Sequence, residues 1–263
     1  MNLDNICNAV IETVIKTGKY IESERKIFDS KNIEKKGLHN FVTHVDKESE
    51  KKIIQELVKI LPEAGFIAEE GTNVKKGERF NWVIDPLDGT TNFIHGCPPF
   101  AISVALMEYD KVIIGVVYEV NMKECFHTHI EKPAYLNDRI IKVSLIDKVF
   151  DSLVATGFPY TNFSRMEGYF KTMDYFMRNS HGLRRLGSAA TDLAYVACGR
   201  YDAFYEYGLN PWDAAAGCLL VQQAGGKVSD FSGTDNYIFG SELIASNSFI
   251  FDELKKIIKN TMF

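Results

Sequence analysis

The chain has 263 residues, of which 46% are hydrophobic and 25% are charged, and its formal net charge is −5. This composition is ordinary for a soluble globular protein with a sizeable core, and the acidic balance argues against a nucleic-acid or anionic membrane surface. No apolar run approaches the ~18 residues of a membrane span. The five cysteines are scattered without a CxxC pair, which indicates reduced thiols in a cytoplasmic protein.

The N-terminal part of the sequence predicts two helices joined by a short connection. Residues 3–28 place apolar side chains at helical spacing and charged side chains largely elsewhere. A second apolar pattern over residues 47–60 follows Asp46, which taken alone is an acidic residue that complements the dipole of this helix. Residues 41–45 fit either a short strand or the first turn of that helix.

Two short apolar strands follow, and each ends on acidic side chains. Residues 66–68 lead into Glu69 and its neighbour Glu70, of which one is expected to turn inward. The strand at 82–84 is expected to stop at Asp85-Pro86, because proline cannot continue a central strand. In an open sheet, such strand ends are where ligands bind.

The stretch Asp85-Pro86-Leu87-Asp88-Gly89-Thr90-Thr91 is the centre of the functional prediction. Its two aspartates lie three residues apart across a sharp turn, so their carboxylates and the intervening Leu87 carbonyl offer the oxygen ligands that suit Mg²⁺. A short helix should follow, capped by Thr90 or Thr91, with backbone N–H groups that form an anion cradle near Gly89. In isolation the same residues are also typical of an ordinary type I turn.

Further strands are predicted at 100–107, 112–118 and 124–130, the first two joined as a hairpin. The last of these strands carries Cys125, His127 and His129 on one face. One alternating row lacks zinc-site spacing, so we interpret these residues as structural. The composition then shifts over residues 131–148, where a strand is expected near 140–143. We therefore predict two subdomains, residues 1–145 and residues 146–263.

The second half alternates strands and helices. Gly187 and Ser188 precede a helix and are interpreted either as its cap or as contacts for an anion or hydroxyl. A strand ends at Glu206, and Asp213 opens the following helix. The other expected elements are a strand at 152–157, a strand near 183, helix 166–178, helix 214–224, two strands within 227–246, and helix 249–259.

Acidic residues therefore recur at the tips of several elements: Glu69, Asp85, Asp88 and Asp213. Carboxylates that share one cleft repel one another, which raises their pKa values. Divalent cations remove this conflict, so the sequence predicts a metal site that acts on a phosphate ester.

Two segments resemble the signatures of the inositol monophosphatase family: Asp85 to Phe93, and Trp212-Asp213-Ala214-Ala215-Ala216-Gly217. Ala68-Glu69-Glu70-Gly71 is similar to its Gly-Glu-Glu element, with alanine replacing the usual glycine. Phe41 to Asp46 resembles its Val-Thr-x-x-Asp element, although Asn40 stands where an aspartate is common. The four elements occur in register across nearly the whole chain.

The resemblance implies a mixed α/β fold, a layered αβαβα sandwich of the inositol monophosphatase and fructose-1,6-bisphosphatase type. It also implies a homodimer that needs Mg²⁺, with two to three ions per active site, and that is commonly inhibited by Li⁺. Glu69, Asp85 and the Leu87 carbonyl would hold one ion, and Asp85, Asp88 and Asp213 would hold a second. Glu69 would also help to hold a third ion.

By the same resemblance, the catalytic residues would be Glu69, Thr90 and Asp46, which orient and activate a water. Phosphate would be held by Gly89, Thr90 and Thr91. The non-phosphate part of the substrate would face Gly187, Ser188, Ala189, Glu206 and Asp213. Water would attack phosphorus directly, because no separate nucleophile motif is present.

The implied activity is hydrolysis of inositol monophosphate to inositol and phosphate. A carboxylate at Glu206 can accept hydrogen bonds from polyol hydroxyls, so a small phosphorylated polyol or sugar is the expected partner. Within the fold, alternatives are fructose 1,6-bisphosphate, histidinol phosphate or a 3′-phosphonucleotide. An alternative of another class is a non-catalytic regulatory protein, which the complete set of carboxylates disfavours.

Overall fold

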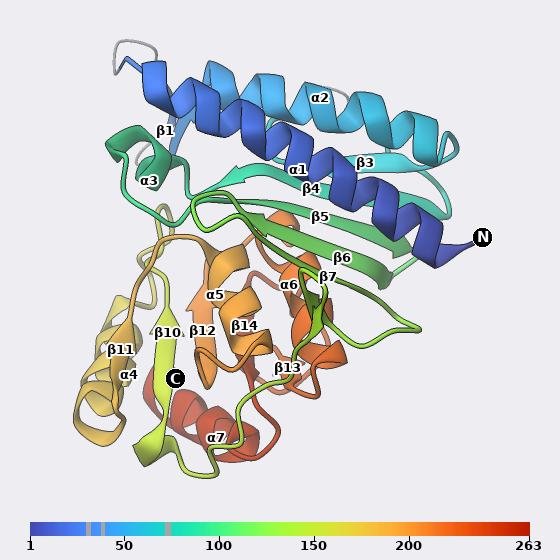
Figure 1. The fold of residues 1–263 in the computed structure, drawn as a ribbon. Coiled ribbons are helices and arrows are strands. Elements are labelled where there is room, and N and C mark those ends of the chain that lie inside the picture. Colours follow the sequence, from blue (N-terminus) through green and yellow to red (C-terminus); the bar gives the residue numbers. More distant parts are fainter. Residues whose placement is uncertain (30–32, 38–39, 72–74) are drawn as a thin grey trace.

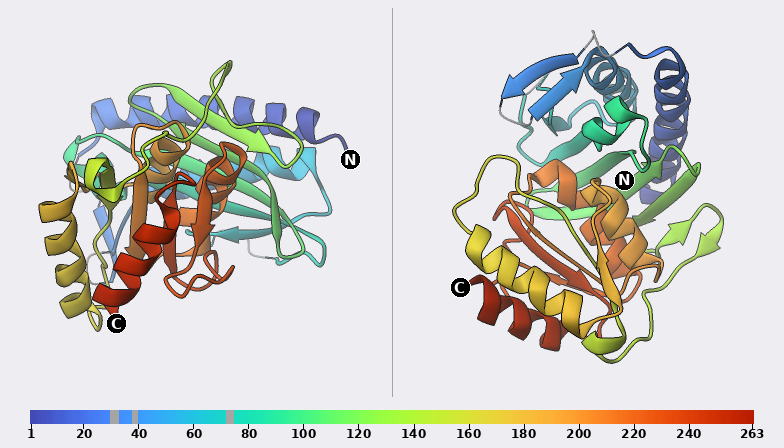
Figure 2. Two further views of the ribbon diagram at one scale, coloured as in Figure 1. Left: turned by 90° about the horizontal axis from the view of Figure 1, so that it is seen from below. Right: turned by 90° about the vertical axis from the view of Figure 1, so that its left-hand side faces the viewer.

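The computed structural model describes residues 1–29, 33–37, 40–71 and 75–263, which form five stacked layers (Figure 1). The layers are a helix pair, a seven-stranded sheet, a second helix pair, a five-stranded sheet and a third helix pair (Figure 2). The predicted αβαβα sandwich is therefore confirmed. Among the helices of the described ranges, none has the length and apolar character required to cross a bilayer.

The first layer consists of α1 (Leu3–Ile27) and α2 (His44–Ile60), which lie side by side over the outer face of the seven-stranded sheet (Figure 1). The second helix begins earlier than predicted because a capping box closes its first turn. The Thr43 hydroxyl accepts the Val45 N–H at 3.1 Å, and the Asp46 carboxylate accepts the Thr43 N–H at 2.8 Å.

The seven-stranded sheet runs in the order β3-β4-β5-β6-β7-β8-β9. Only β3 and β4 are parallel, so their carboxyl ends lie at the same edge and bring Glu69 next to the end of β4. Its strands are β3 (Gly65–Ala68), β4 (Phe80–Asp88), β5 (Ala101–Glu108), β6 (Lys111–Glu119), β7 (Glu124–His129), β8 (Tyr135–Leu136) and β9 (Arg139–Ile140).

The middle layer, α5 (Ala189–Ala197) and α6 (Pro211–Gln223), fills the space between the two sheets (Figure 1). Small residues allow α6 to approach the sheet closely. A Cβ atom added at Gly115 of β6 would lie 2.7 Å from the Ala216 carbonyl oxygen. This contact fixes the height of α6 above the seven-stranded sheet, and hence the position of its first turn.

The five-stranded sheet runs in the order β11-β10-β12-β14-β13, with β10 parallel to both of its neighbours. Its outer face is covered by α4 and α7 (Figure 2). The elements are η2 (Val149–Asp151), β10 (Leu153–Thr156), α4 (Met166–Asn179), β11 (Gly182–Arg184), β12 (Ala203–Tyr207), β13 (Lys227–Ser229), β14 (Glu242–Ser246) and α7 (Phe251–Met262).

The central stretch differs from the prediction in two respects. First, β4 does not stop at Asp85-Pro86 but continues to Asp88. Its pairing with β5 shifts register between Asp85 and Asp88, and this bulge accommodates a proline that cannot donate to the ladder. Second, neither Thr90 nor Thr91 caps α3 (Thr90–His95), because its N-cap is Gly89, at a left-handed φ of 91°.

Two smaller features complete the fold. A hairpin of β1 (Ile33–Gly37) and β2 (Asn40–Thr43) precedes α2, which confirms the short strand expected there. The strand expected near 140–143 is reduced to the two residues of β9. The division into subdomains at residue 145 stays a prediction: each sheet belongs to one side of that boundary, but α5 and α6 pack against both sheets.

Candidate active site

A pocket of about 310 Å³ lies where the two sheets present their strand ends to each other. Residues at the carboxyl ends of β3, β4, β10 and β12 and at the starts of α3, α5 and α6 form its walls. All the predicted site residues line it except Asp46: they are Glu69, Asp85, Leu87, Asp88, Gly89, Thr90, Thr91, Gly187, Ser188, Ala189, Glu206 and Asp213.

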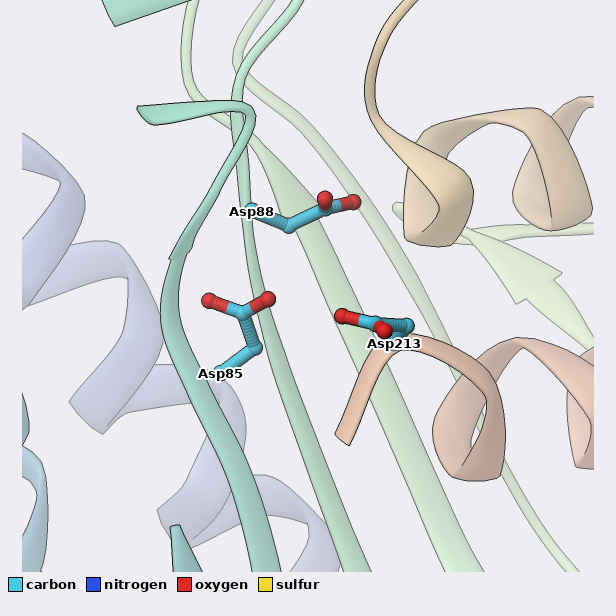
Figure 3. Close-up of side chains that lie close together, drawn as sticks. All are labelled: Asp85, Asp88 and Asp213. Atoms are coloured by element: carbon cyan, nitrogen blue, oxygen red, sulfur yellow. The ribbon is translucent and has the colours of Figure 1, made fainter. Parts of the chain in front are cut away.

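Three carboxylates form the acidic centre of this pocket (Figure 3). Asp85 and Asp88 project from the bulged end of β4, and Asp213 projects from the first turn of α6. One oxygen from each lies within 4.8 Å of the others, which suits ligation of a common cation. The chain thus brings together residues that are more than a hundred positions apart.

Burial and mutual repulsion destabilise the charged forms of these acids. Burial, reinforced by the charges of Asp213 and Glu70, raises the pKa of Glu69 to about 8. Burial and the Asp88 charge raise the pKa of Asp213 to about 7, and burial raises that of Asp88 to about 6. The pKa of Asp85 lies well above its ordinary range for the same reasons. A bound cation would compensate this concentrated negative charge.

Backbone hydrogen bonds hold each aspartate in place. The Leu87 N–H donates to Asp85 Oδ1 at 2.9 Å, and the Ala190 N–H donates to Asp88 Oδ2 at 2.8 Å. In α6 the Asn210 N–H donates to Asp213 Oδ2 at 2.7 Å as part of a capping box. The predicted helix-opening role of Asp213 is therefore confirmed, while its carboxylate also lines the pocket.

Asp46 lies behind the pocket wall and reaches it through Thr90. The Thr90 hydroxyl lies 2.9 Å from Asp46 Oδ1 and 3.1 Å from the Leu87 carbonyl oxygen. Asp46 is only 1% exposed and also accepts hydrogen bonds from Thr43. These bonds fix the orientation of the Thr90 hydroxyl at the edge of the pocket, next to the acidic cluster.

Gly89 forms the corner between β4 and α3 and meets the second half of the chain. Its positive φ favours glycine, and an added Cβ would lie 3.3 Å from the Gly187 carbonyl oxygen. The N–H groups at the start of a helix lack intrahelical partners, so those that follow Gly89 can bind an anion. Thr90 and Thr91 both line the pocket at this point.

Another wall of the pocket is formed by residues of the second half of the chain. Ser188 caps α5, so its predicted capping role is confirmed, and it also lines the pocket. Glu206 is 7% exposed, and its carboxylate lies over Gly157, where an added Cβ would be 1.9 Å from Oε2. Burial, together with the charges of Asp192 and Asp213, holds the pKa of Glu206 well above its ordinary range.

Sequence reasoning missed two charged residues of this wall, Arg185 and Asp192. Asp192 follows Ser188 by four residues on a helix, so helical spacing from the predicted site residue was an available signal. Arg185 directly precedes the predicted turn, but the sequence held no indication that its side chain turns toward the pocket.

The three residues that alternate along β7, Cys125, His127 and His129, have structural roles, as predicted. The His129 Nε2 atom lies 3.1 Å from Asp4 Oδ1, His127 stacks on Tyr135, and Cys125 is buried. Within the described ranges, the group of Asp85, Asp88 and Asp213 is the one cluster whose side chains could hold a metal. All five cysteines are unpaired.

Comparisons with known proteins agree over the full length of the chain. Residues 2–261 match the sequence model of the inositol monophosphatase family. The inositol-1-monophosphatase of Mesorhizobium japonicum is 36% identical, with 98% of this chain and 97% of that protein covered. The Nus factor SuhB of Pseudomonas aeruginosa is 37% identical, covering 96% and 95%. The crystal structure of the extragenic suppressor protein suhB from Bartonella henselae matches with a TM-score of 0.90 and 36% identity, covering 96% and 97%.

Proposed function

This chain belongs to the inositol monophosphatase family, and we propose that it is a Mg²⁺-dependent phosphomonoesterase that hydrolyses inositol 1-phosphate to inositol and phosphate. The observation that carries this proposal is the complete acidic cluster, which lies in one pocket with the phosphate-binding corner at Gly89 and the carboxylate of Glu206. The Mesorhizobium japonicum relative is named an inositol-1-monophosphatase, which supports the same substrate.

The donor set fits Mg²⁺, because carboxylate and carbonyl oxygens are the hard ligands that this ion prefers. Asp85, Asp88 and Asp213 would hold one ion, and Glu69, Asp85 and the Leu87 carbonyl would hold another. Bound cations would supply charge compensation for the phosphate and make a water molecule more acidic. The raised pKa values of Glu69, Asp85 and Asp213 indicate that their negative charges are uncompensated without a bound cation.

The residues beside the cluster would position the attacking water. Because the Thr90 hydroxyl donates a hydrogen bond to Asp46, its oxygen is free to accept a hydrogen bond from that water. Glu69 borders the same space and would accept the proton that the water releases. The water would then attack phosphorus in line with the departing ester oxygen, and no covalent intermediate is required.

Binding of the substrate would divide between the two halves of the pocket. The N–H groups at Gly89, Thr90 and Thr91 would hold the phosphate oxygens, which fixes phosphorus next to the acidic cluster. The polyol would lie against the start of α5 and Glu206, where a carboxylate can accept hydrogen bonds from hydroxyl groups. This division places the ester bond between the two halves.

The direct test is phosphate release by the purified full-length protein. We would assay inositol 1-phosphate, fructose 1,6-bisphosphate, histidinol phosphate and 3′-phosphoadenosine 5′-phosphate, each with Mg²⁺, with EDTA, and with Mg²⁺ plus Li⁺. We expect inositol 1-phosphate to be cleaved fastest, with loss of activity in EDTA and inhibition by Li⁺. Preferred cleavage of another ester would replace the substrate, and cleavage that resists EDTA would overturn the metal-dependent mechanism.

A regulatory role is the second candidate, because several relatives of similar identity carry the name Nus factor SuhB. The complete acidic cluster argues that such a role would accompany hydrolysis rather than replace it. Mg²⁺ binding measured by calorimetry, without turnover of any ester in the panel, would favour the regulatory role alone.

A further inference from the structure

Asp192 is a buried carboxylate in the pocket wall to which the proposed mechanism gives no role. It lies in the first turn of α5 and is 1% exposed. Its Oδ1 atom is shielded from solvent and, among the described residues, has no hydrogen-bond partner. The side chain nevertheless lines the pocket. A buried carboxylate oxygen without a partner costs stability, so a ligand that donates a hydrogen bond to it is the natural explanation.

Arg185 presents the complementary group in the same wall. Its guanidinium carbon lies 5.0 Å from the Phe158 ring centroid, and its Nη2 donates to the Tyr160 hydroxyl at 2.7 Å. The aromatic contacts hold the side chain against the pocket rather than in solvent. The Arg185 Nε–H is buried and finds no acceptor within the described part of the chain. The wall therefore contains an unused acceptor and an unused donor.

One chemical group satisfies both needs. A hydroxyl donates one hydrogen bond and accepts others, so hydroxyls on a bound molecule can serve Asp192 and Arg185 together. Building on the hydrolase function proposed above, we propose that Asp192 is a specificity-determining residue that accepts a hydrogen bond from a substrate hydroxyl. Together with Glu206 and Arg185 it selects the monophosphate of a neutral polyol with several free hydroxyls.

The charges of this wall disfavour the other substrate classes. The acidic groups of Asp192 and Glu206 outnumber the guanidinium of Arg185, so a second phosphate group would meet one cationic partner and two acidic side chains in this wall. A cationic amine could donate to the carboxylates but could not accept from the Arg185 Nε–H, which would remain unsatisfied. A neutral polyol avoids both penalties.

The experiment compares the wild-type protein with Asp192→Asn on two esters, inositol 1-phosphate and phenyl phosphate, which has no free hydroxyl. We expect the ratio of kcat/KM for inositol 1-phosphate to that for phenyl phosphate to fall on the order of 10- to 100-fold. We also expect Tm to stay the same or to rise, since the variant replaces a buried acidic group whose Oδ1 atom has no partner among the described residues. A purely structural role would instead lower Tm and reduce both activities equally.

The matched control is Asp202→Asn, which changes a buried aspartate that pairs with Ser144 and the Leu153 N–H away from the pocket. This variant should lose stability but keep the wild-type substrate ratio. An unchanged ratio in Asp192→Asn, or an equal loss on both esters, would overturn the inference. A higher kcat/KM of the wild-type protein for histidinol phosphate than for inositol 1-phosphate would also overturn it.

The hydrolase proposal and the role of Asp192 can fail separately. If the wild-type protein cleaves neither ester in Mg²⁺, the hydrolase proposal fails, and binding of inositol 1-phosphate is then measured by calorimetry in the same buffer. Binding at least about tenfold weaker in Asp192→Asn would still support the inference. Equal binding by the two proteins, or no binding by either, would overturn it.

Discussion

The Ser188 hydroxyl donates a hydrogen bond of 2.6 Å to Asp88 Oδ2, and this bond joins the start of α5 to the end of β4. The same oxygen also accepts the Ala190 N–H, so two donors from the C-terminal half of the chain stabilise one carboxylate of the acidic cluster. Ser188 itself lines the pocket on the side proposed for the polyol. A substrate that moves α5 would therefore act directly on the proposed metal site.

Ser188→Ala tests this connection. Loss of the hydroxyl removes a donor that lowers the pKa of Asp88, so we expect weaker Mg²⁺ binding. Residues that orient metal ligands typically contribute 10- to 100-fold, and we expect a loss of about that size in kcat/KM at limiting Mg²⁺. Calorimetry and a Mg²⁺ titration of activity measure the effect. Ser152→Ala, at a buried serine outside the pocket, should leave the Mg²⁺ requirement unchanged.

Asp85→Asn should abolish activity, because Asp85 is proposed to contact two metal ions. The loss should exceed the roughly 100-fold upper value for residues that act behind the ligands. Mg²⁺ binding measured by calorimetry should fall with it, while the metal-free variant should be at least as stable as the metal-free wild-type protein, since asparagine cannot acquire the buried charge that the raised pKa of Asp85 shows to be unfavourable. Near-normal turnover would show that the metal assignment is wrong.

The metal-free protein should lose stability as the pH rises. The folded state holds protons on Asp88, Asp213 and Glu69 up to pKa values of about 6, 7 and 8, whereas the unfolded chain releases them near its ordinary values of about 4. Between about pH 5 and pH 8 the folded state therefore binds more protons, and the free energy of unfolding falls with pH.

Mg²⁺ should oppose this trend, because it binds the deprotonated carboxylates. We expect the difference in Tm between samples with Mg²⁺ and samples with EDTA to grow from pH 5 to pH 8, as followed by thermal unfolding. A difference that is constant across this range would indicate that the cluster is not where Mg²⁺ binds.

Sequence reasoning located the acidic cluster because its members follow recognisable breaks: a strand that ends at Glu69, the Asp85-Pro86 step, and a helix that starts near Asp213. The prediction failed where tertiary contacts determine the local structure. Pro86 stays within β4 because β5 accepts a bulge there, and Thr90 serves Asp46 instead of capping its helix. Arg185 precedes α5 and reaches the pocket through the packing of that helix between the two sheets, a relationship that no local pattern encodes, whereas the helical spacing from Ser188 was a signal for Asp192.

Glu206→Gln should change substrate preference more than metal requirement. Glutamine keeps the size of the side chain but replaces one acceptor oxygen with a donor, so one hydrogen bond from a polyol hydroxyl is lost. We expect kcat/KM for inositol 1-phosphate to fall about tenfold or more relative to phenyl phosphate, with an unchanged Mg²⁺ concentration for half-maximal activity. An equal loss on every phosphomonoester would argue against a role in recognising the polyol.

Gly157→Ala should reproduce the effect of Glu206→Gln without touching the carboxylate itself. The backbone at Gly157 is not in the left-handed region, so the residue is needed for space rather than for conformation. An added methyl group would lie 1.9 Å from Glu206 Oε2 and must push that carboxylate out of its position. We expect a fall in the ratio of kcat/KM for inositol 1-phosphate to that for phenyl phosphate. Gly225→Ala, which has open space but a φ of 91°, should cost stability and leave the ratio intact. If Gly157→Ala kept the wild-type ratio, the position of Glu206 over Gly157 would have no part in substrate selection.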